Sequence, residues 1–121
     1  MTSTAVHLSK KDRSFLALAV KIAEQSSCDT RHGAVIVKGG SVLAVGWNKN
    51  KNHPTVFGEG SILCASVHAE MDALSKVSDA KGATMYIARL NKRGVPMMSK
   101  PCESCSEGLD RAGIRRVVHT A

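Results

Sequence analysis

The apolar residues near the start of the chain are spaced as on one face of a helix. Four of them recur at helical intervals: Phe15, Ala19, Ile22 and Ala23. They follow Ser9 and Asp12, which together form a capping pattern. We therefore expect a helix over about residues 10–25.

Two runs rich in β-branched residues come next, at residues 34–37 and 41–45. They flank Gly39 and Gly40, and glycine accepts the positive φ that a tight turn needs. The runs therefore predict a β-hairpin. Residues 48–64 are polar and interrupted by proline and glycine, which is typical of a loop.

The remainder of the chain predicts helix, strand, helix and strand. The first helical stripe consists of Val67, Met71, Leu74 and Val77. Ser66 is the expected cap of this helix, and residues 84–87 form the expected strand after it. The second helical stripe consists of Cys105, Leu109 and Ala112. Gly113 can end that helix, and residues 114–118 predict a final strand.

This order of elements determines the expected fold class. A helix between successive strands implies parallel crossovers and hence a layered α/β protein. A chain of 121 residues is long enough for one modest core, so we expect one domain over residues 1–121. No apolar run approaches the roughly 20 residues that a membrane-spanning helix needs, so no membrane partner is expected.

Two short polar clusters carry the candidate chemistry, and each lies where a loop becomes a helix. They are His68-Ala69-Glu70 and Pro101-Cys102-Glu103-Ser104-Cys105. Cys102 and Cys105 are three positions apart, so both sulfurs point the same way from one helical turn. A helix N-terminus also favours the thiolate form that metals bind. His68 is the expected third ligand, from the start of the other helix.

Three protein ligands leave one position of a tetrahedral zinc site for water, as in catalytic zinc sites. Zinc lowers the pKa of such a water towards 7, and Glu70 could act as the general acid and base beside it. The H-x-E and P-C-x-x-C motifs together are typical of zinc nucleobase deaminases. A structural zinc knot and a thiol redox pair are the alternatives, because either motif alone is weak evidence.

From about Lys10 to His119 the chain resembles the cytidine and deoxycytidylate deaminase superfamily. Beyond the zinc motif, three similar segments are Arg31 to Val37, Gly46-Trp47-Asn48 and Lys81 to Tyr86. The last of these, with Ala112-Gly113-Ile114, resembles deoxycytidylate deaminases in particular. The resemblance implies a three-layer α/β/α sandwich around a mixed sheet of four to five strands. It also implies that Asn48 binds the sugar and that the backbone N–H of Ala69 fixes the base.

Three features depart from that family. Lys100 stands where a serine often precedes the Pro-Cys pair, and the loop from Asn48 to His68 lacks a long insertion that some members carry. The family's last strand is absent after residue 118, and its direction would have helped to separate substrate classes. The sequence therefore does not define the substrate.

Charge narrows the candidate partners. The formal net charge is +7 and the pI is about 9.5, which favours anionic partners or simply a solvated surface. Basic residues assigned to loops near the site could meet a 5′-phosphate: Lys49, Lys51, Arg89, Lys92, Arg93 and Lys100. Aromatic residues make up only 3%, which argues against a nucleic-acid substrate gripped by base stacking. The sequence indicates no role for His32. His53 is expected to be a solvated histidine, and Cys64 a buried or loop thiol.

The leading hypothesis is hydrolytic deamination of a cytosine nucleotide or nucleoside, dCMP or CMP before the free nucleosides. One alternative is base deamination in nucleic acid, on tRNA adenosine or single-stranded cytosine. Another is a non-catalytic binding module stabilised by zinc.

No secretory signal is visible, so a cytoplasmic or nuclear location is expected. In such a location the cysteines are expected to serve as metal ligands or as thiols, such as a structural Cys28. A homo-oligomer is also expected, because a small domain ending at a strand leaves an edge to cover.

Overall fold

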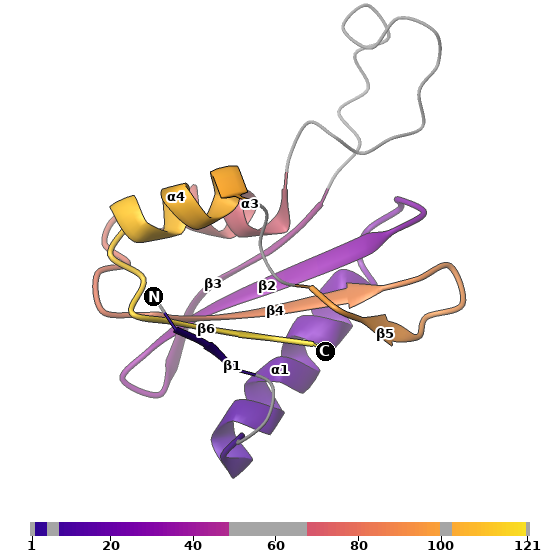
Figure 1. The fold of residues 1–121 in the computed structure, drawn as a ribbon, viewed down its shortest axis with the longest axis horizontal. Helices are drawn as coiled ribbons and strands as arrows, with labels where there is room; N and C mark the ends of the chain where they lie inside the picture. The colour runs from indigo at the N-terminus through magenta and orange to yellow at the C-terminus, as the bar shows by residue number, and fades with distance from the viewer. Residues whose placement is uncertain (1, 5–7, 49–67, 100–102, 121) are drawn as a thin grey trace, which may run out of the picture.

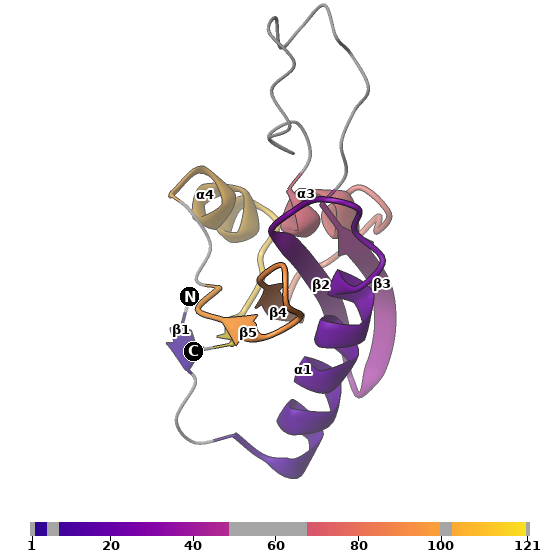
Figure 2. The same cartoon turned by 90° about the vertical axis from the view of Figure 1, so that its right-hand side faces the viewer.

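The computed structural model describes residues 2–4, 8–48, 68–99 and 103–120, and shows a sheet with helices on both faces (Figure 1, Figure 2). In chain order the elements are β1 (Thr2–Thr4), α1 (Lys10–Ala23), β2 (Arg31–Lys38), β3 (Ser41–Trp47), α3 (Ala69–Leu74), β4 (Thr84–Leu90), β5 (Pro96–Met97), α4 (Glu103–Arg111) and β6 (Arg116–His119). The strand order is β1-β6-β4-β2-β3, and the short β5 pairs with β4.

The strand directions place the starts of two helices at one end of the sheet. β2 pairs antiparallel with both β3 and β4, so β3 and β4 run in the same direction on either side of it. β6 pairs parallel with β4. α3 comes after β3 in the chain, and α4 comes after β4 and the short β5, and Figure 1 shows both helices over the same face of the sheet. Open α/β sheets bind ligands at this end.

The two faces of the sheet carry separate cores because strand side chains alternate. One core packs beneath α3 and α4 and includes Ala34, Ile36, Met85, Ile87, Leu109 and Val117. The other packs against α1 and includes Val35, Val37, Tyr86, Ala88 and Val118. Figure 2 shows α1 on the opposite side of the sheet from α3 and α4. The expected three-layer α/β/α arrangement is confirmed.

Two glycines let the helices lie directly on the backbone of the sheet. A Cβ atom on Gly33 of β2 would lie 2.2 Å from the carbonyl oxygen of Ala19 in α1. A Cβ atom on Gly46 of β3 would lie 2.4 Å from the backbone nitrogen of Ala73 in α3. Real Cβ contacts are essentially never this short. The first turn of α3, which carries the candidate catalytic residues, is therefore seated on Gly46.

Most expected elements are present, with shifted boundaries. The hairpin is confirmed, and its turn glycines have φ of 61° and 80°. The helix expected from Ser66 is shorter than predicted and has His68 as its N-cap, while Ser66 itself lies outside the described residues. The sequence did not predict β1 or β5. β1 pairs parallel with β6, so the strand beyond β6 in this sheet comes from the start of the chain.

No helix in the described ranges combines the length and the apolar character that crossing a membrane requires.

Candidate active site

The candidate site lies where the first turns of α3 and α4 meet. His68 immediately precedes α3 in extended conformation, and its side chain makes no capping hydrogen bond. Its Nδ1 atom lies 3.1 Å from the Sγ atom of Cys105, the third residue of α4. Cys105 is 2% exposed, whereas His68 is exposed to solvent. The fold thus brings together two of the expected zinc ligands that are 37 positions apart in sequence.

The third expected ligand, Cys102, lies outside the described residues, as do Pro101 and Lys100. Among the residues that the structure describes, no three His, Cys, Asp or Glu side chains form a group that could hold a metal ion. The donor set that is present fits zinc, since imidazole nitrogen and thiolate sulfur are its preferred ligands. Two such ligands on a tetrahedral zinc lie about 3.6 Å apart, about half an ångström beyond the separation in this structure.

Glu70 and Ala69 occupy the start of α3, directly after His68. Glu70 lies in the first helical turn and is 4% exposed. A buried carboxylate needs a partner or a function, because burying a charge without compensation is costly. Ala69 is fully buried, and its backbone N–H belongs to the first turn of the helix, where such groups have no partner within the helix.

Asn48 fastens two chain segments next to this site. It is 6% exposed, its Oδ1 atom accepts a hydrogen bond from the backbone nitrogen of His32, and its Nδ2 atom donates one to the carbonyl oxygen of Thr30, both at 2.8 Å. Ser26 Oγ donates to the carbonyl oxygen of Asn48 at 2.9 Å. These contacts show a structural role for Asn48. Its expected contact with a sugar stays a prediction.

A second set of polar side chains fixes the position of α3 on the sheet. Asp72 is 8% exposed and accepts hydrogen bonds from the backbone nitrogen of Trp47 at 3.2 Å and from Lys76 Nζ at 3.3 Å. Lys76 also donates to the carbonyl oxygen of Val45 at 2.8 Å and lies 5.0 Å from the centre of the Trp47 ring. The sequence contains the i,i+4 spacing of Asp72 and Lys76, but gives no sign of their contacts with β3.

The chain just before residues 100–102 is held by a serine–threonine pair. Ser99 is 5% exposed, and its hydroxyl donates to the carbonyl oxygen of Ile87 at 2.8 Å. The hydroxyls of Ser99 and Thr120 lie 2.8 Å apart. The backbone nitrogen of Thr120 donates to Ser99 Oγ at 3.0 Å, and the backbone nitrogen of Ser99 donates to the carbonyl oxygen of Thr120 at 3.0 Å. The pair ties the segment before residue 100 to the middle of β4 and to the residue that follows β6. No local sequence pattern indicates this pair.

Two basic residues lie on the same face of the sheet as the candidate site. His32 of β2 and Arg89 of β4 are direct cross-strand partners, so Arg89 lies in a strand and not in the expected loop. Burial, and then the charges of Arg89 and His68, lower the pKa of His32 from 6.5 to about 4. Arg89 Nε is buried and has no hydrogen-bond partner among the described residues. No motif in the sequence indicates a role for His32.

The opposite face of the sheet holds a buried ionic network. Asp12 is 4% exposed and binds both terminal nitrogens of Arg116, at 3.0 and 2.7 Å, and the hydroxyl of Tyr86 at 2.7 Å. The Arg116 hydrogen bond holds the pKa of Asp12 below its ordinary value. Burial, followed by the Asp12 hydrogen bond, raises the pKa of Tyr86 to about 12. This network joins α1 to β4 and β6 and lies away from the candidate site.

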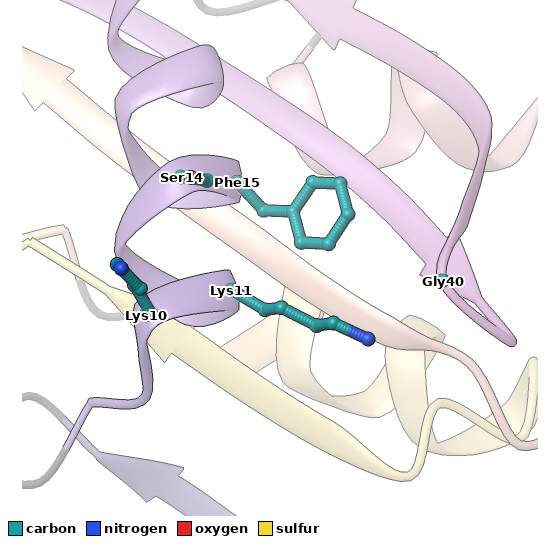
Figure 3. Close-up of a pocket in the computed structure, with 5 residues that line it drawn as sticks. All are labelled: Lys10, Lys11, Ser14, Phe15 and Gly40. Carbon is teal, nitrogen blue, oxygen red and sulfur yellow. The ribbon is translucent and has the colours of Figure 1, made fainter.

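A pocket of about 310 Å³ also lies on the α1 side of the sheet, between that helix and the hairpin turn. Its lining residues are Lys10, Lys11, Ser14, Phe15 and Gly40 (Figure 3). Figure 3 shows the side chains of Lys11 and Phe15 extending from α1 toward the turn at Gly40. The pocket is therefore separated by the sheet from the residues that carry the candidate chemistry.

The remaining candidates from the sequence are two cysteines, one histidine and two lysines. Cys28 is buried and disulfide-bonded, which corrects the expectation of a structural thiol, and its Sγ atom lies 3.7 Å from the carbonyl oxygen of Asn48. Cys64 and His53 lie outside the described residues, as do Lys49 and Lys51.

Comparisons with known proteins agree with the motif analysis. A family model for the cytidine and deoxycytidylate deaminase zinc-binding region matches residues 9–121. The deoxycytidylate deaminase of Mycobacterium phage D29 is 31% identical, and the match covers 89% of this chain and 92% of that protein.

Solved structures show the same fold. The dCMP deaminase of cyanophage S-TIM5 in its apo form is 26% identical, with a TM-score of 0.70 over 93% of this chain and 84% of that chain. The structure of the same enzyme in complex with dCMP and dUMP is 25% identical, with a TM-score of 0.69 and coverage of 93% and 83%. By the extent of the family match and the identity to a curated member, this chain belongs to the cytidine and deoxycytidylate deaminase family of enzymes.

Proposed function

We propose that this chain uses zinc to deaminate the cytosine base of a pyrimidine nucleotide hydrolytically, with dCMP preferred to CMP and to the free nucleosides. The observation that carries the proposal is the approach of His68 Nδ1 to Cys105 Sγ beside the buried Glu70. The dCMP deaminases among the similar proteins and the net charge of +7 support a phosphorylated substrate.

Each residue of the site has a distinct proposed task. His68, Cys105 and Cys102 would hold the metal, which when bound supplies a Lewis acid that activates water. Glu70 would accept a proton from the attacking water and deliver it to the base, so that the amino group leaves as ammonia. Water is consumed, the C4–N bond breaks, and a C4–O bond replaces it. The backbone of α3 packs directly against Gly46 of β3. This close packing would fix the first helical turn and so position the carboxylate of Glu70.

The test is ammonia release from zinc-loaded protein over dCMP, CMP, deoxycytidine, cytidine, cytosine and short single-stranded RNA and DNA. We expect turnover of dCMP with the highest kcat/KM. Glu70→Gln should keep its zinc and its fold, judged by metal analysis and Tm, and lose at least about 100-fold in kcat. Glu107→Gln is the matched control, because Glu107 lies on an exposed part of α4 and pairs with Arg111. Equal turnover by wild type and Glu70→Gln would refute the assignment.

The strongest competing function is deamination of a base within nucleic acid, which the net charge of +7 favours. Binding to a polynucleotide neutralises several phosphates, so its affinity should fall steeply with salt. A single nucleotide carries one phosphate and should respond much less. Turnover confined to the RNA or DNA arm, with a steep salt dependence, would replace the nucleotide proposal.

A further inference from the structure

Arg89 and His32 form a basic cross-strand pair on the candidate-site face of the sheet. In β4, Met85 and Ile87 belong to the core beneath α3 and α4, so Arg89 two residues later faces the same side. His32 lies opposite it in β2 and precedes Ala34 on that face.

The register places this pair beside the start of α3. Ala34 is paired with both Ile87 and Gly46, and Gly46 is where the first turn of α3 touches the sheet. The His32–Arg89 pair is one step further toward the end of the sheet, about 7 Å along the strands.

One buried donor atom of Arg89 lacks an acceptor within the part of the chain that the structure describes. Its Nε atom is buried and has no hydrogen-bond partner among the described residues. A buried donor left unpaired destabilises a protein, so a ligand that supplies an acceptor would relieve that cost. His32, with a pKa of about 4, is uncharged at neutral pH, so the positive charge of the pair resides on Arg89.

We propose that Arg89 binds the 5′-phosphate of the nucleotide and so makes this chain select monophosphates over free nucleosides. The inference rests on the proposed function and deepens it. The phosphate is the only anionic group of dCMP, and a guanidinium matches phosphate oxygens in charge and in fork geometry. His32, joined to Asn48 through its backbone nitrogen, forms the adjoining wall of the phosphate site.

The experiment measures kcat/KM for dCMP and for deoxycytidine with zinc-loaded Arg89→Met, which keeps an unbranched apolar stem but removes the charge. The ratio of the two values should fall about 10- to 100-fold relative to wild type, as expected for a lost charge-assisted hydrogen bond. Arg89→Lys should keep an intermediate ratio. Arg115→Met is the matched control, because Arg115 is exposed and precedes β6 at the far end of the sheet, and its ratio should equal that of wild type.

Binding of the products dUMP and deoxyuridine, measured by calorimetry, separates this inference from the reaction itself. The preference for dUMP should shrink in Arg89→Met by the same factor as the kinetic ratio. Equal losses for both substrates, or an unchanged ratio, would overturn the phosphate role while leaving the deaminase proposal intact. A wild type that binds dUMP through Arg89 but releases no ammonia would instead refute the reaction and retain the phosphate site.

Discussion

Substitution of Gly46 by alanine should displace the first turn of α3, which carries the proposed general acid and base Glu70. The new Cβ atom would lie 2.4 Å from the backbone nitrogen of Ala73 and 2.6 Å from the carbonyl oxygen of Ala69. Ordinary contacts begin at 3.4 Å, and both obstructing atoms are backbone, so α3 must recede by about 1 Å. His68 and Glu70 border this turn and should move with it.

The size of the effect follows from that displacement. Overpacking of this kind costs about 1–3 kcal/mol of unfolding free energy, and a domain of this size loses roughly 4 °C in Tm per kcal/mol. We therefore expect a Tm lower by about 4–12 °C. A misplacement of about 1 Å at a reacting group can cost about 100-fold in rate, so kcat/KM for dCMP should fall by 10- to 100-fold at a temperature where the variant is folded.

Gly33→Ala is the matched control for this experiment. Its Cβ atom would lie 2.2 Å from Ala19 O and 2.4 Å from Ala23 N, so the overlap is similar, but the helix displaced is α1 on the other face. Thermal melts and ammonia release at matched folded fractions would compare the two variants. The reasoning is refuted if Gly46→Ala retains wild-type kcat/KM, or if Gly33→Ala loses as much activity as Gly46→Ala.

Three further predictions concern charge, metal and the segment before the second motif. Asp12→Asn should lower the free energy of unfolding at pH 7 by about 3 kcal/mol, because it leaves Arg116 partly buried without its carboxylate partner. The pKa of Asp12 is lowered on folding, so this stabilisation is complete above the ordinary value of 3.8 and is lost as the pH falls below it. In urea melts from pH 7 to pH 2, the free energy of unfolding should therefore fall less with acid for Asp12→Asn than for wild type. Removal of zinc with a chelator should abolish turnover and lower Tm, zinc should restore both, and Cys105→Ala should bind zinc too weakly to be rescued; full zinc content in that variant would disprove its role as a ligand. Ser99→Ala removes a buried hydroxyl between Ile87 and Thr120, and should cost about 1–3 kcal/mol in chemical denaturation; a stability equal to that of wild type would contradict the anchoring role.

The sequence pattern predicted the elements whose apolar residues recur at regular intervals. It missed the short strands that form only by pairing with another strand. α1 and the β2–β3 hairpin could be inferred because apolar spacing, caps and turn glycines all agree locally. β1 is a short Thr-Ser-Thr segment without apolar periodicity, and it becomes a strand by pairing with the edge of β6. β5 has two residues and exists through its pairing with β4.

For the candidate site too, the sequence predicted the residues of local motifs and missed those brought together by strand register. His68, Glu70 and Cys105 could be proposed as site residues because zinc deamination uses those residue types at those spacings. The sequence predicts Arg89 in a loop, because the apolar pattern does not show how far β4 extends. Its partnership with His32 depends on strand register between segments 57 positions apart, which no local pattern encodes. The Asp12–Arg116 pair spans 104 positions and was missed for the same reason.

The most direct test of the account is X-ray absorption at the zinc edge on the purified full chain, followed by ammonia release from the same sample. We expect one zinc per chain with one nitrogen at about 2.0–2.1 Å and two sulfurs at about 2.3 Å. Cys105→Ala should retain little zinc after the same treatment, and dCMP should be deaminated by the wild-type sample alone. A protein that deaminates dCMP without bound zinc, or whose zinc has no sulfur ligands, would contradict the account.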